Sequence, residues 1–252
     1  MRCQLAMDQA IRVAIGLAST SSKDRVLRVS ELFSSLQGEG ASAGKPAVFL
    51  RLAGCNLSCR WCDTDYTWNF ERYDYTKEVH KRSVDELAGV INAEQPDLLI
   101  VTGGEPMLQQ LALIRLFREL NRTTQIEVET NGTLMAMAKF AQRVHQFNLS
   151  PKLSSAGEFA TRRIQLDVLQ SFKSHANAWL KLVIEHEEEL EEADELVAEL
   201  KWPKERVMLM PQGTSFEELR DKSVWLARAC TARGVALSPR LHVMIWGNRR
   251  GV

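Results

Sequence analysis

Three cysteines lie close together in the sequence, at Cys55, Cys59 and Cys62. Thiolates at these spacings can hold three corners of a four-iron, four-sulfur cluster and leave the fourth iron open for chemistry. A structural zinc site is an alternative, but it needs a fourth ligand, and the nearest histidine, His80, lies well beyond the loop. Cysteines can also cluster as small buried side chains, although the residues between these three are largely polar. The pattern therefore favours an iron–sulfur cluster.

The composition limits what such a cluster can act on. The 252 residues carry 32 basic and 32 acidic side chains, so no overall positive field attracts nucleic acid or an anionic membrane. No apolar run approaches the ~20 residues that span a bilayer. We therefore expect a small-molecule substrate, with neither nucleic acid nor membrane as a partner.

The five cysteines make a poor disulfide framework, because three of them share one loop. This distribution indicates a reducing compartment, the cytoplasm, where thiolates stay available to a metal. Cys230 lies in an apolar helical stretch and is expected to pack in the core, and Cys3 lies near the beginning. Residues 1–25 are expected to form an N-terminal extension that is poorly ordered. Residues 26–252 are expected to form a single domain, because this length suffices for one large α/β core.

Alternating strands and helices must position the cysteine loop. Strands are predicted at 28–33, 47–52, 98–102, 126–130, 147–150, 179–184 and 206–210. Helices are predicted at 83–95, 108–120, 134–146, 164–175, 187–200 and 215–233, two of them opened by the capping boxes Ser83–Glu86 and Ser215–Glu218. Such alternation implies parallel pairing through right-handed crossovers. The predicted fold is α/β, a partial (β/α)6 barrel that resembles a TIM barrel open on one side. The aromatic-rich stretch 65–81, which has no clean period, is expected to cover the site.

Candidate site residues follow the predicted strands at their carboxyl ends, where barrels of this kind hold reacting groups. Thr102–Pro106 contains two glycines, which allow a backbone to approach a ligand closely, although a simple tight turn would look the same. Glu129 and Asn131 end the next strand. Ser150–Lys152 and Gln212–Thr214 end later strands, and loop solvation would also explain their polarity.

Lys181 interrupts an otherwise apolar predicted strand. A buried ammonium group needs compensation. Lys181 is therefore expected either to point toward a ligand inside the barrel or to pair with a neighbouring carboxylate.

The cysteine spacing, with Trp61 directly before the last thiol, resembles the signature of the radical S-adenosylmethionine (SAM) superfamily. The flanking motifs look like those of the 7-carboxy-7-deazaguanine synthase family, namely Leu36–Gly40, Phe49–Gly54, Asp63–Thr64 and Trp246–Val252. Thr102–Pro106 and Ser150–Lys152 fall between them in the expected order. The resemblance covers roughly residue 28 onward and implies a barrel of the radical SAM type.

The resemblance also implies cofactors and their ligands. A 4Fe-4S cluster is expected on Cys55, Cys59 and Cys62. SAM is expected at Gly104, which would face its methionine amino group, and at the other cofactor positions Trp61, Glu129, Ser150, Pro151, Lys152, Gln212, Gly213 and Thr214. A magnesium ion is expected at the Thr64 hydroxyl, a site that ligand counting cannot reveal because Mg2+ keeps several waters.

The implied substrate is 6-carboxy-5,6,7,8-tetrahydropterin. Gln37 can pair with an amide edge, Glu39 can accept from N–H groups, and Arg51 offers a planar fork for a carboxylate. Alternatively, Arg51 pairs with Asp63 or Glu39, and the Gln37–Gly40 run is only a turn. The carboxylate of Val252 is expected to approach the substrate, and the full expected set is Leu36, Gln37, Gly38, Glu39, Arg51, Thr102, His242 and Val252.

The implied reaction begins when an external donor such as a flavodoxin or ferredoxin reduces the cluster, which then cleaves SAM to methionine and a 5′-deoxyadenosyl radical. The radical would take hydrogen from C6 of the pterin, and ring contraction with loss of ammonia would give 7-carboxy-7-deazaguanine for queuosine-type biosynthesis. The resemblance also implies a homodimer. A glycyl-radical-enzyme activase shares the cysteine spacing, but the substrate motifs argue against it. A zinc-stabilised binding module is the remaining alternative.

Overall fold

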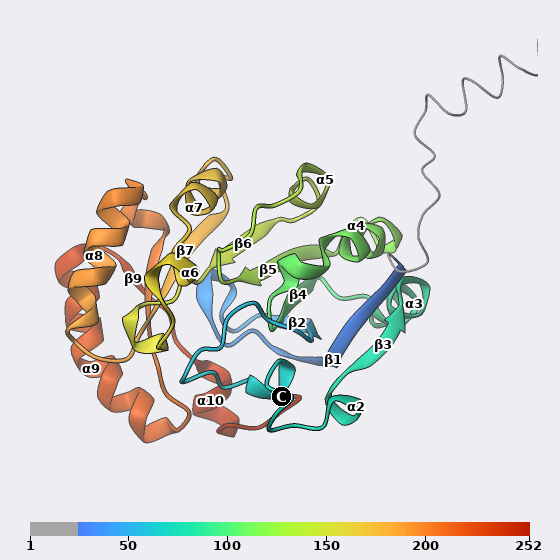
Figure 1. The fold of residues 1–252 in the computed structure, drawn as a ribbon, viewed down its shortest axis with the longest axis horizontal. Helices are drawn as coiled ribbons and strands as arrows, with labels where there is room; N and C mark the ends of the chain where they lie inside the picture. The colour runs from blue at the N-terminus through green and yellow to red at the C-terminus, as the bar shows by residue number, and fades with distance from the viewer. Residues whose placement is uncertain (1–24) are drawn as a thin grey trace, which may run out of the picture.

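The computed structural model describes residues 25–252, and in this part of the chain the strands form one curved sheet (Figure 1). The predicted N-terminal extension, apart from Arg25, and Cys3 lie outside the described residues. β1 pairs antiparallel with β2 and β3, whereas all pairs from β2 to β9 are parallel. The strand order is β3 (His80–Ser83), β1 (Val26–Leu36), β2 (Pro46–Leu52), β4 (Leu98–Gly103), β5 (Gln125–Thr130), β6 (Gln146–Leu149), β7 (Ala178–Ile184), β8 (Val207–Pro211) and β9 (Ala236–Leu237).

Helical segments follow each parallel strand from β2 to β8, so six β/α units form the predicted partial barrel. Figure 1 shows the longer helices along the outer side of the curved sheet. The longer helices are α3 (Val84–Glu94), α4 (Gln110–Glu119), α7 (Leu166–Lys173), α8 (Glu189–Leu200) and α9 (Phe216–Arg233), and the short helices α5 (Ala138–Ala141) and α6 (Ala160–Arg163) lie between β5 and β7 along the chain. Within 25–252, the edge strands β3 and β9 do not pair, which leaves the barrel open. None of the described helices is long and apolar enough to cross a membrane.

The alternation of side chains along the strands explains how the sheet presents polar groups to the site. Successive residues of a strand point to opposite faces. On β5, Ile126 joins the hydrophobic core that the helices cover, whereas Glu129 lines the cavity inside the barrel. On β7, Leu180 joins the same core, and Lys181 lines the cavity. Glu129 and Lys181 therefore lie on the faces of their strands that line the cavity.

The helix predicted at 134–146 is wrong over most of its length, because only Ala138–Ala141 is helical. The side chain of Gln110 provides the reason. Its Nε2 donates to the carbonyl of Met135 over 3.0 Å, and its Oε1 accepts from the amide of Met137 over 2.7 Å. These backbone groups bond to a side chain rather than within a helix, and the next strand begins at Gln146.

The two predicted capping boxes differ in the structure. At α9 both halves form, because Ser215 accepts from the Glu218 amide and Glu218 reaches back to the Ser215 amide. At α3 Ser83 accepts from the Glu86 amide over 3.1 Å, but the Glu86 carboxylate pairs instead with Arg82 at 2.7 Å. The strands β3 and β9 and the helix α10 (Leu241–Trp246) were not predicted.

Candidate active site

One cavity lies at the carboxyl ends of the parallel strands and collects residues from motifs far apart in the sequence. Most predicted site residues line it, namely Leu36, Gln37, Gly38, Glu39, Arg51, Cys55, Cys59, Trp61, Cys62, Thr64, Thr102, Gly104, Glu129, Ser150, Lys152, Gln212, His242 and Val252. Pro151, Gly213 and Thr214 do not line it. Tyr66 and Trp68, from the stretch expected to cover the site, are part of its wall.

The cysteine loop follows β2 and is held against the loop after β6. The amide of Arg60 donates to the carbonyl of Ala156 over 2.9 Å, and Trp61 Nε1 donates to Ser155 Oγ over 2.9 Å. Ala156 packs under Cys59 in a small buried cluster that Cys55 and Cys62 adjoin. These contacts fix the backbone of the loop while its three thiols face one cavity.

The donor set fits an iron–sulfur cluster. Cys55, Cys59 and Cys62 are free of disulfides, and burial raises the pKa of the Cys55 thiol to about 12. A thiolate there therefore needs a positive centre beside it, which iron would supply. Among the described residues, no three His, Cys, Asp or Glu side chains converge to hold a single metal ion. The three thiols share one loop and line one cavity, and this donor set is the one that a four-iron cluster uses.

The two glycines after β4 allow a close approach between backbone segments. A Cβ on Gly103 would lie 2.2 Å from the carbonyl oxygen of Leu52, and one on Gly104 would lie 2.1 Å from that of Gly54. The Gly104 amide donates to Leu52 over 2.9 Å, and the Glu105 amide donates to Gly54 over 2.8 Å. The two glycines therefore allow the backbone after β4 to lie directly against the backbone of residues 52–54, which precede Cys55.

Glu105 is a buried residue that the sequence analysis did not single out. It is fully buried, and its carboxylate accepts from the Met107 amide at 2.9 Å, Thr130 Oγ1 at 2.8 Å and the Asn131 amide at 2.8 Å. Burial raises the pKa of Glu105, although these hydrogen bonds oppose the shift. Asn131 in turn donates to Asn56 in the cysteine loop over 2.9 Å. Glu105 thus ties the ends of β4 and β5 to that loop, and its place after two glycines at a strand end was the available signal.

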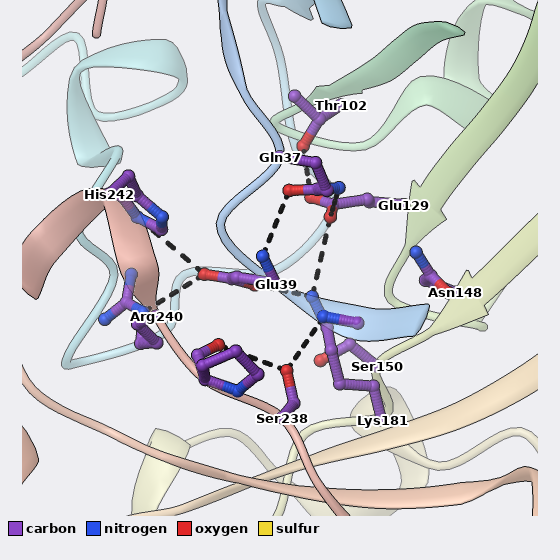
Figure 2. A network of polar contacts seen from close by, with 12 residues as sticks. Gln37, Glu39, Thr102, Glu129, Asn148, Ser150, Lys181, Ser238, Arg240 and His242 are labelled. Carbon is purple, nitrogen blue, oxygen red and sulfur yellow. Dashed lines mark hydrogen bonds and ion pairs between the residues drawn. The ribbon is translucent and has the colours of Figure 1, made fainter. Parts of the chain in front are cut away.

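Glu39 lies at the centre of a buried ionic network (Figure 2). Its two carboxylate oxygens contact Lys181 Nζ at 2.5 Å and Arg240 Nε at 3.0 Å, and His242 Nε2 lies 3.9 Å away. Burial by itself would raise the pKa of Glu39, but Lys181, Arg240 and His242 overcome it and hold the pKa well below its usual range. Lys181 also lies 3.5 Å from Glu129. It therefore both points into the barrel and pairs with carboxylates.

Gln37 is buried and its amide group is already engaged by the protein. Its Nε2 donates to Glu129 over 3.2 Å, and its Oε1 accepts from the Glu39 amide over 3.2 Å. Thr102 Oγ1 donates to the other oxygen of Glu129 over 2.9 Å. A pterin edge that pairs with Gln37 must therefore join or replace these bonds.

Arg51 and Asp63 have partners other than those predicted. Arg51 pairs with Glu31 at 2.7 Å, and neither Asp63 nor Glu39 is its ion-pair partner in residues 25–252. Asp63 pairs with Arg240 instead. Arg240, which the sequence analysis missed, also donates to the carbonyl of Gly213. It thus joins the turn at Glu39, the end of the cysteine loop and the segment after β8.

The remaining predicted residues stand close to the cysteines. Thr64 Oγ1 lies 3.7 Å from Cys62 Sγ. Lys152 donates to Ser150 Oγ over 2.9 Å, and its ammonium lies 5.6 Å from the centre of the Trp61 ring. Burial lowers the pKa of His242, so its imidazole is neutral at pH 7 and can donate from one nitrogen and accept at the other.

Comparison with known proteins gives a consistent assignment. The family model for a 4Fe-4S single cluster domain matches residues 36–150. The 7-carboxy-7-deazaguanine synthase of Pyrobaculum aerophilum is 36% identical over 226 residues, which are 89% of this chain and 97% of that protein. The enzyme of the same name from Hyperthermus butylicus is 33% identical over 90% of this chain and 95% of that protein.

A solved structure agrees with these sequence relatives. The crystal structure of QueE from Escherichia coli superposes with a TM-score of 0.63 at 29% identity, covering 84% of this chain and 93% of that one. The family match at the cysteines, the relatives over nearly their full length and the shared fold point to one conclusion. The chain belongs to the 7-carboxy-7-deazaguanine synthase family.

Proposed function

We propose that the protein is a radical SAM lyase that converts 6-carboxy-5,6,7,8-tetrahydropterin to 7-carboxy-7-deazaguanine with loss of ammonia. The reaction is a step of 7-deazapurine biosynthesis of the queuosine type. One observation carries the proposal: the three cysteines, the turn at Gln37–Glu39 and the segment 247–252 all line the same cavity. A cluster-bound cofactor and a flat polar substrate can therefore meet there.

The cofactors are a 4Fe-4S cluster and SAM, which when bound supply radical chemistry that removes a hydrogen atom from the substrate. Cys55, Cys59 and Cys62 hold the cluster. We assign the predicted cofactor residues to SAM. Trp61, Gly104, Glu129, Ser150, Lys152 and Gln212 line the cavity with the cysteines, whereas Pro151, Gly213 and Thr214 are assigned on the resemblance. The protein contributes alignment of the reacting atoms and exclusion of water, which Tyr66 and Trp68 provide as part of the cavity wall.

The substrate side of the cavity is assigned to Glu39, Arg51 and His242. Glu39 remains ionised, because its pKa is held low, and a carboxylate offers about four lone-pair positions. Arg51 donates from Nε to Glu31, and we assign its two terminal nitrogens to hydrogen bonds with the substrate carboxylate. Leu36, Gly38, Thr102 and Val252 complete the wall.

Magnesium is assigned to Thr64, supported by the position of its hydroxyl between the cysteine loop and the cavity. Replacement of Thr64 by Ala is expected to raise the Mg2+ concentration for half-maximal rate about tenfold, because one oxygen ligand is lost. Iron content should not change. Turnover measured over a range of Mg2+ concentrations tests this, with Thr76→Ala on the exposed cover as the control. An unaltered Mg2+ response in Thr64→Ala would remove Thr64 from the site.

Three further features belong to the proposal. An external one-electron donor such as a flavodoxin or ferredoxin reduces the cluster. The protein assembles as a homodimer and works in the cytoplasm, where thiols stay reduced. One domain covers residues 26–252, supported by the single sheet that runs through the described chain.

Anaerobic incubation with the pterin and SAM, followed by mass spectrometry, tests the reaction. The expected products are 7-carboxy-7-deazaguanine and ammonia, with SAM regenerated. SAM cleavage without consumption of the pterin would favour an activase of a glycyl-radical enzyme. Colourless protein that contains zinc would instead indicate a structural module, because a four-iron cluster is brown.

A further inference from the structure

The side chain of Arg250 attaches segment 247–252 to residues 65–81, which we call the cover of the cavity. Arg250 Nη1 contacts both carboxylate oxygens of Glu78, at 2.9 and 3.2 Å. The Arg250 guanidinium also stacks on Tyr66, with Cζ 3.5 Å from the ring centre. Glu78 ends α2 (Tyr75–Glu78), and Tyr66 lies in η3 (Asp65–Thr67). Arg250 therefore bridges two elements of the cover at once.

A second set of bonds leads from Tyr66 to the assigned substrate side. The Tyr66 hydroxyl donates to Glu31 Oε2 over 2.7 Å, and the same oxygen accepts from Arg51 Nε over 2.7 Å. Burial raises the pKa of Tyr66, so the hydroxyl keeps its proton and remains a donor. Arg250, Tyr66, Glu31 and Arg51 thus form a continuous chain of contacts from the cover to the guanidinium fork.

We call the contacts of Arg250 with Glu78 and Tyr66 the clamp. The positions of these residues show which of them could touch the substrate directly and which could act only through others. Arg250, Tyr66, Arg51 and Val252 line the cavity, whereas Glu78 does not. Glu78 is therefore able to influence the substrate only through Arg250 or the cover. The backbone on either side of the clamp turns at Gly247 and Gly251, which have φ of +69° and +70°. Holding such a segment in one conformation before binding reduces the entropy lost when the substrate arrives.

We propose that Arg250 is a positioning residue that fastens segment 247–252 across the cavity and fixes Tyr66, so that Glu31 orients Arg51 toward the substrate carboxylate. This inference rests on the proposed function and names a residue that controls pterin binding. Arg250 acts through Glu78 and Tyr66, and its effect falls on the pterin rather than on the cluster or SAM.

Calorimetric binding of the pterin to anaerobic, cluster-loaded protein with SAM and without reductant tests the clamp. Arg250→Gln is expected to raise the pterin Kd about tenfold, because it removes the ion pair and the ring contact together. Arg250→Lys should recover part of the loss, since it keeps the charge but not the planar fork. Iron content and SAM affinity should remain those of the wild type. In turnover, KM for the pterin should rise more than kcat falls.

Arg72→Gln is the matched control. Arg72 pairs with Asp65 at 3.0 Å and lies 5.3 Å from the ring centre of Tyr73, on the same cover. It does not line the cavity. Its replacement should leave the pterin Kd unchanged, and a loss equal to that of Arg250→Gln would reduce the clamp to a general effect on the cover and overturn the proposal.

Glu78→Gln decides between a clamp and a direct ligand. It should weaken pterin binding in the same direction as Arg250→Gln, and the double variant should bind no more weakly than Arg250→Gln. If Glu78→Gln left the pterin Kd unchanged while Arg250→Gln raised it, Arg250 would be a direct ligand and the proposal would be overturned. The proposal would also be overturned if both variants bound the pterin with the wild-type Kd. If the wild-type protein itself does not bind the pterin, the proposed function fails together with the clamp.

Discussion

Replacing Cys59 by Ala is expected to yield protein that contains little iron and does not cleave SAM. Two remaining thiolates leave two corners of the cube without a protein ligand, which is too few to retain the cluster. Cys59 is buried against Ala156 and Leu57 and lines the cavity with the other two thiols. Iron content per chain and visible absorption of anaerobically prepared protein measure the loss. The same outcome is expected for Cys55→Ala and Cys62→Ala.

Cys230→Ala is the matched control for this prediction. Cys230 is buried in α9, and its thiol donates to the carbonyl of Ala236 over 3.5 Å. Its replacement removes one small buried group, so stability should fall slightly while iron content and SAM cleavage persist. A full complement of iron in Cys59→Ala would show that the cysteine loop does not hold the cluster.

The parts of the site that could be predicted from sequence are those with a local signal. The thiols of Cys55, Cys59 and Cys62 lie within one loop, so their spacing alone indicates a shared ligand. The parallel strands are recognisable from short apolar runs, and the barrel follows from their alternation with helices. Lys181 stands out because it interrupts such a run, Glu129 stands out because it lies at a strand end, and alternation along the strand directs both inward.

The partners of these residues could not be predicted, because they come from distant parts of the chain. Glu39 meets Lys181 and Arg240, which lie 142 and 201 residues further along. The helical and strand periodicities of the sequence contain no information about such a distant pairing. Arg51 shows the same limit, since Asp63 and Glu39 were the predicted candidates and the fold instead selects Glu31, which was not predicted. The helix predicted at 134–146 failed for a related reason, because the side chain of Gln110 bonds its backbone from another helix.

Arg240 shows why these distant contacts matter for function. Arg240 is buried, with 6% of its surface exposed, and its side chain contacts Glu39, Asp63 and the carbonyl of Gly213. These three groups belong to the turn assigned to the substrate, the end of the cysteine loop, and the segment after β8. Asp63 and Glu39 raise the pKa of Arg240 despite its burial. The guanidinium group of Arg240 thereby fixes the relative positions of three segments that contribute to the site.

Replacing Arg240 by Gln is therefore expected to lower the free energy of unfolding by about 3–5 kcal/mol at pH 7, because Asp63 and Glu39 lose a buried partner. Arg240→Lys should cost less, since it retains the charge. Denaturant unfolding measures both, and Arg233→Gln is the control: Arg233 pairs with Asp194 at 2.9 Å on the surface, where a pair contributes only about 0–1 kcal/mol. Equal stability of Arg240→Gln and the wild type would contradict the role given to Arg240.

The pH dependence of the same variant gives a second, independent test. In the wild type the pKa of Glu39 lies well below its ordinary value of 4.5, so the ionised carboxylate stabilises the fold above that value, and this contribution is lost only as the pH falls toward the lower, folded pKa. Without Arg240, burial of Glu39 is opposed by Lys181 and His242 alone, so its pKa rises. The contribution of Glu39 that acid removes should then be smaller in Arg240→Gln than in the wild type, because the folded pKa lies closer to the ordinary value. Denaturant unfolding at pH 7 and at about pH 3 should therefore show the difference in free energy of unfolding between the two proteins narrowing at the lower pH. An equal difference at both pH values would mean that Arg240 does not keep Glu39 ionised.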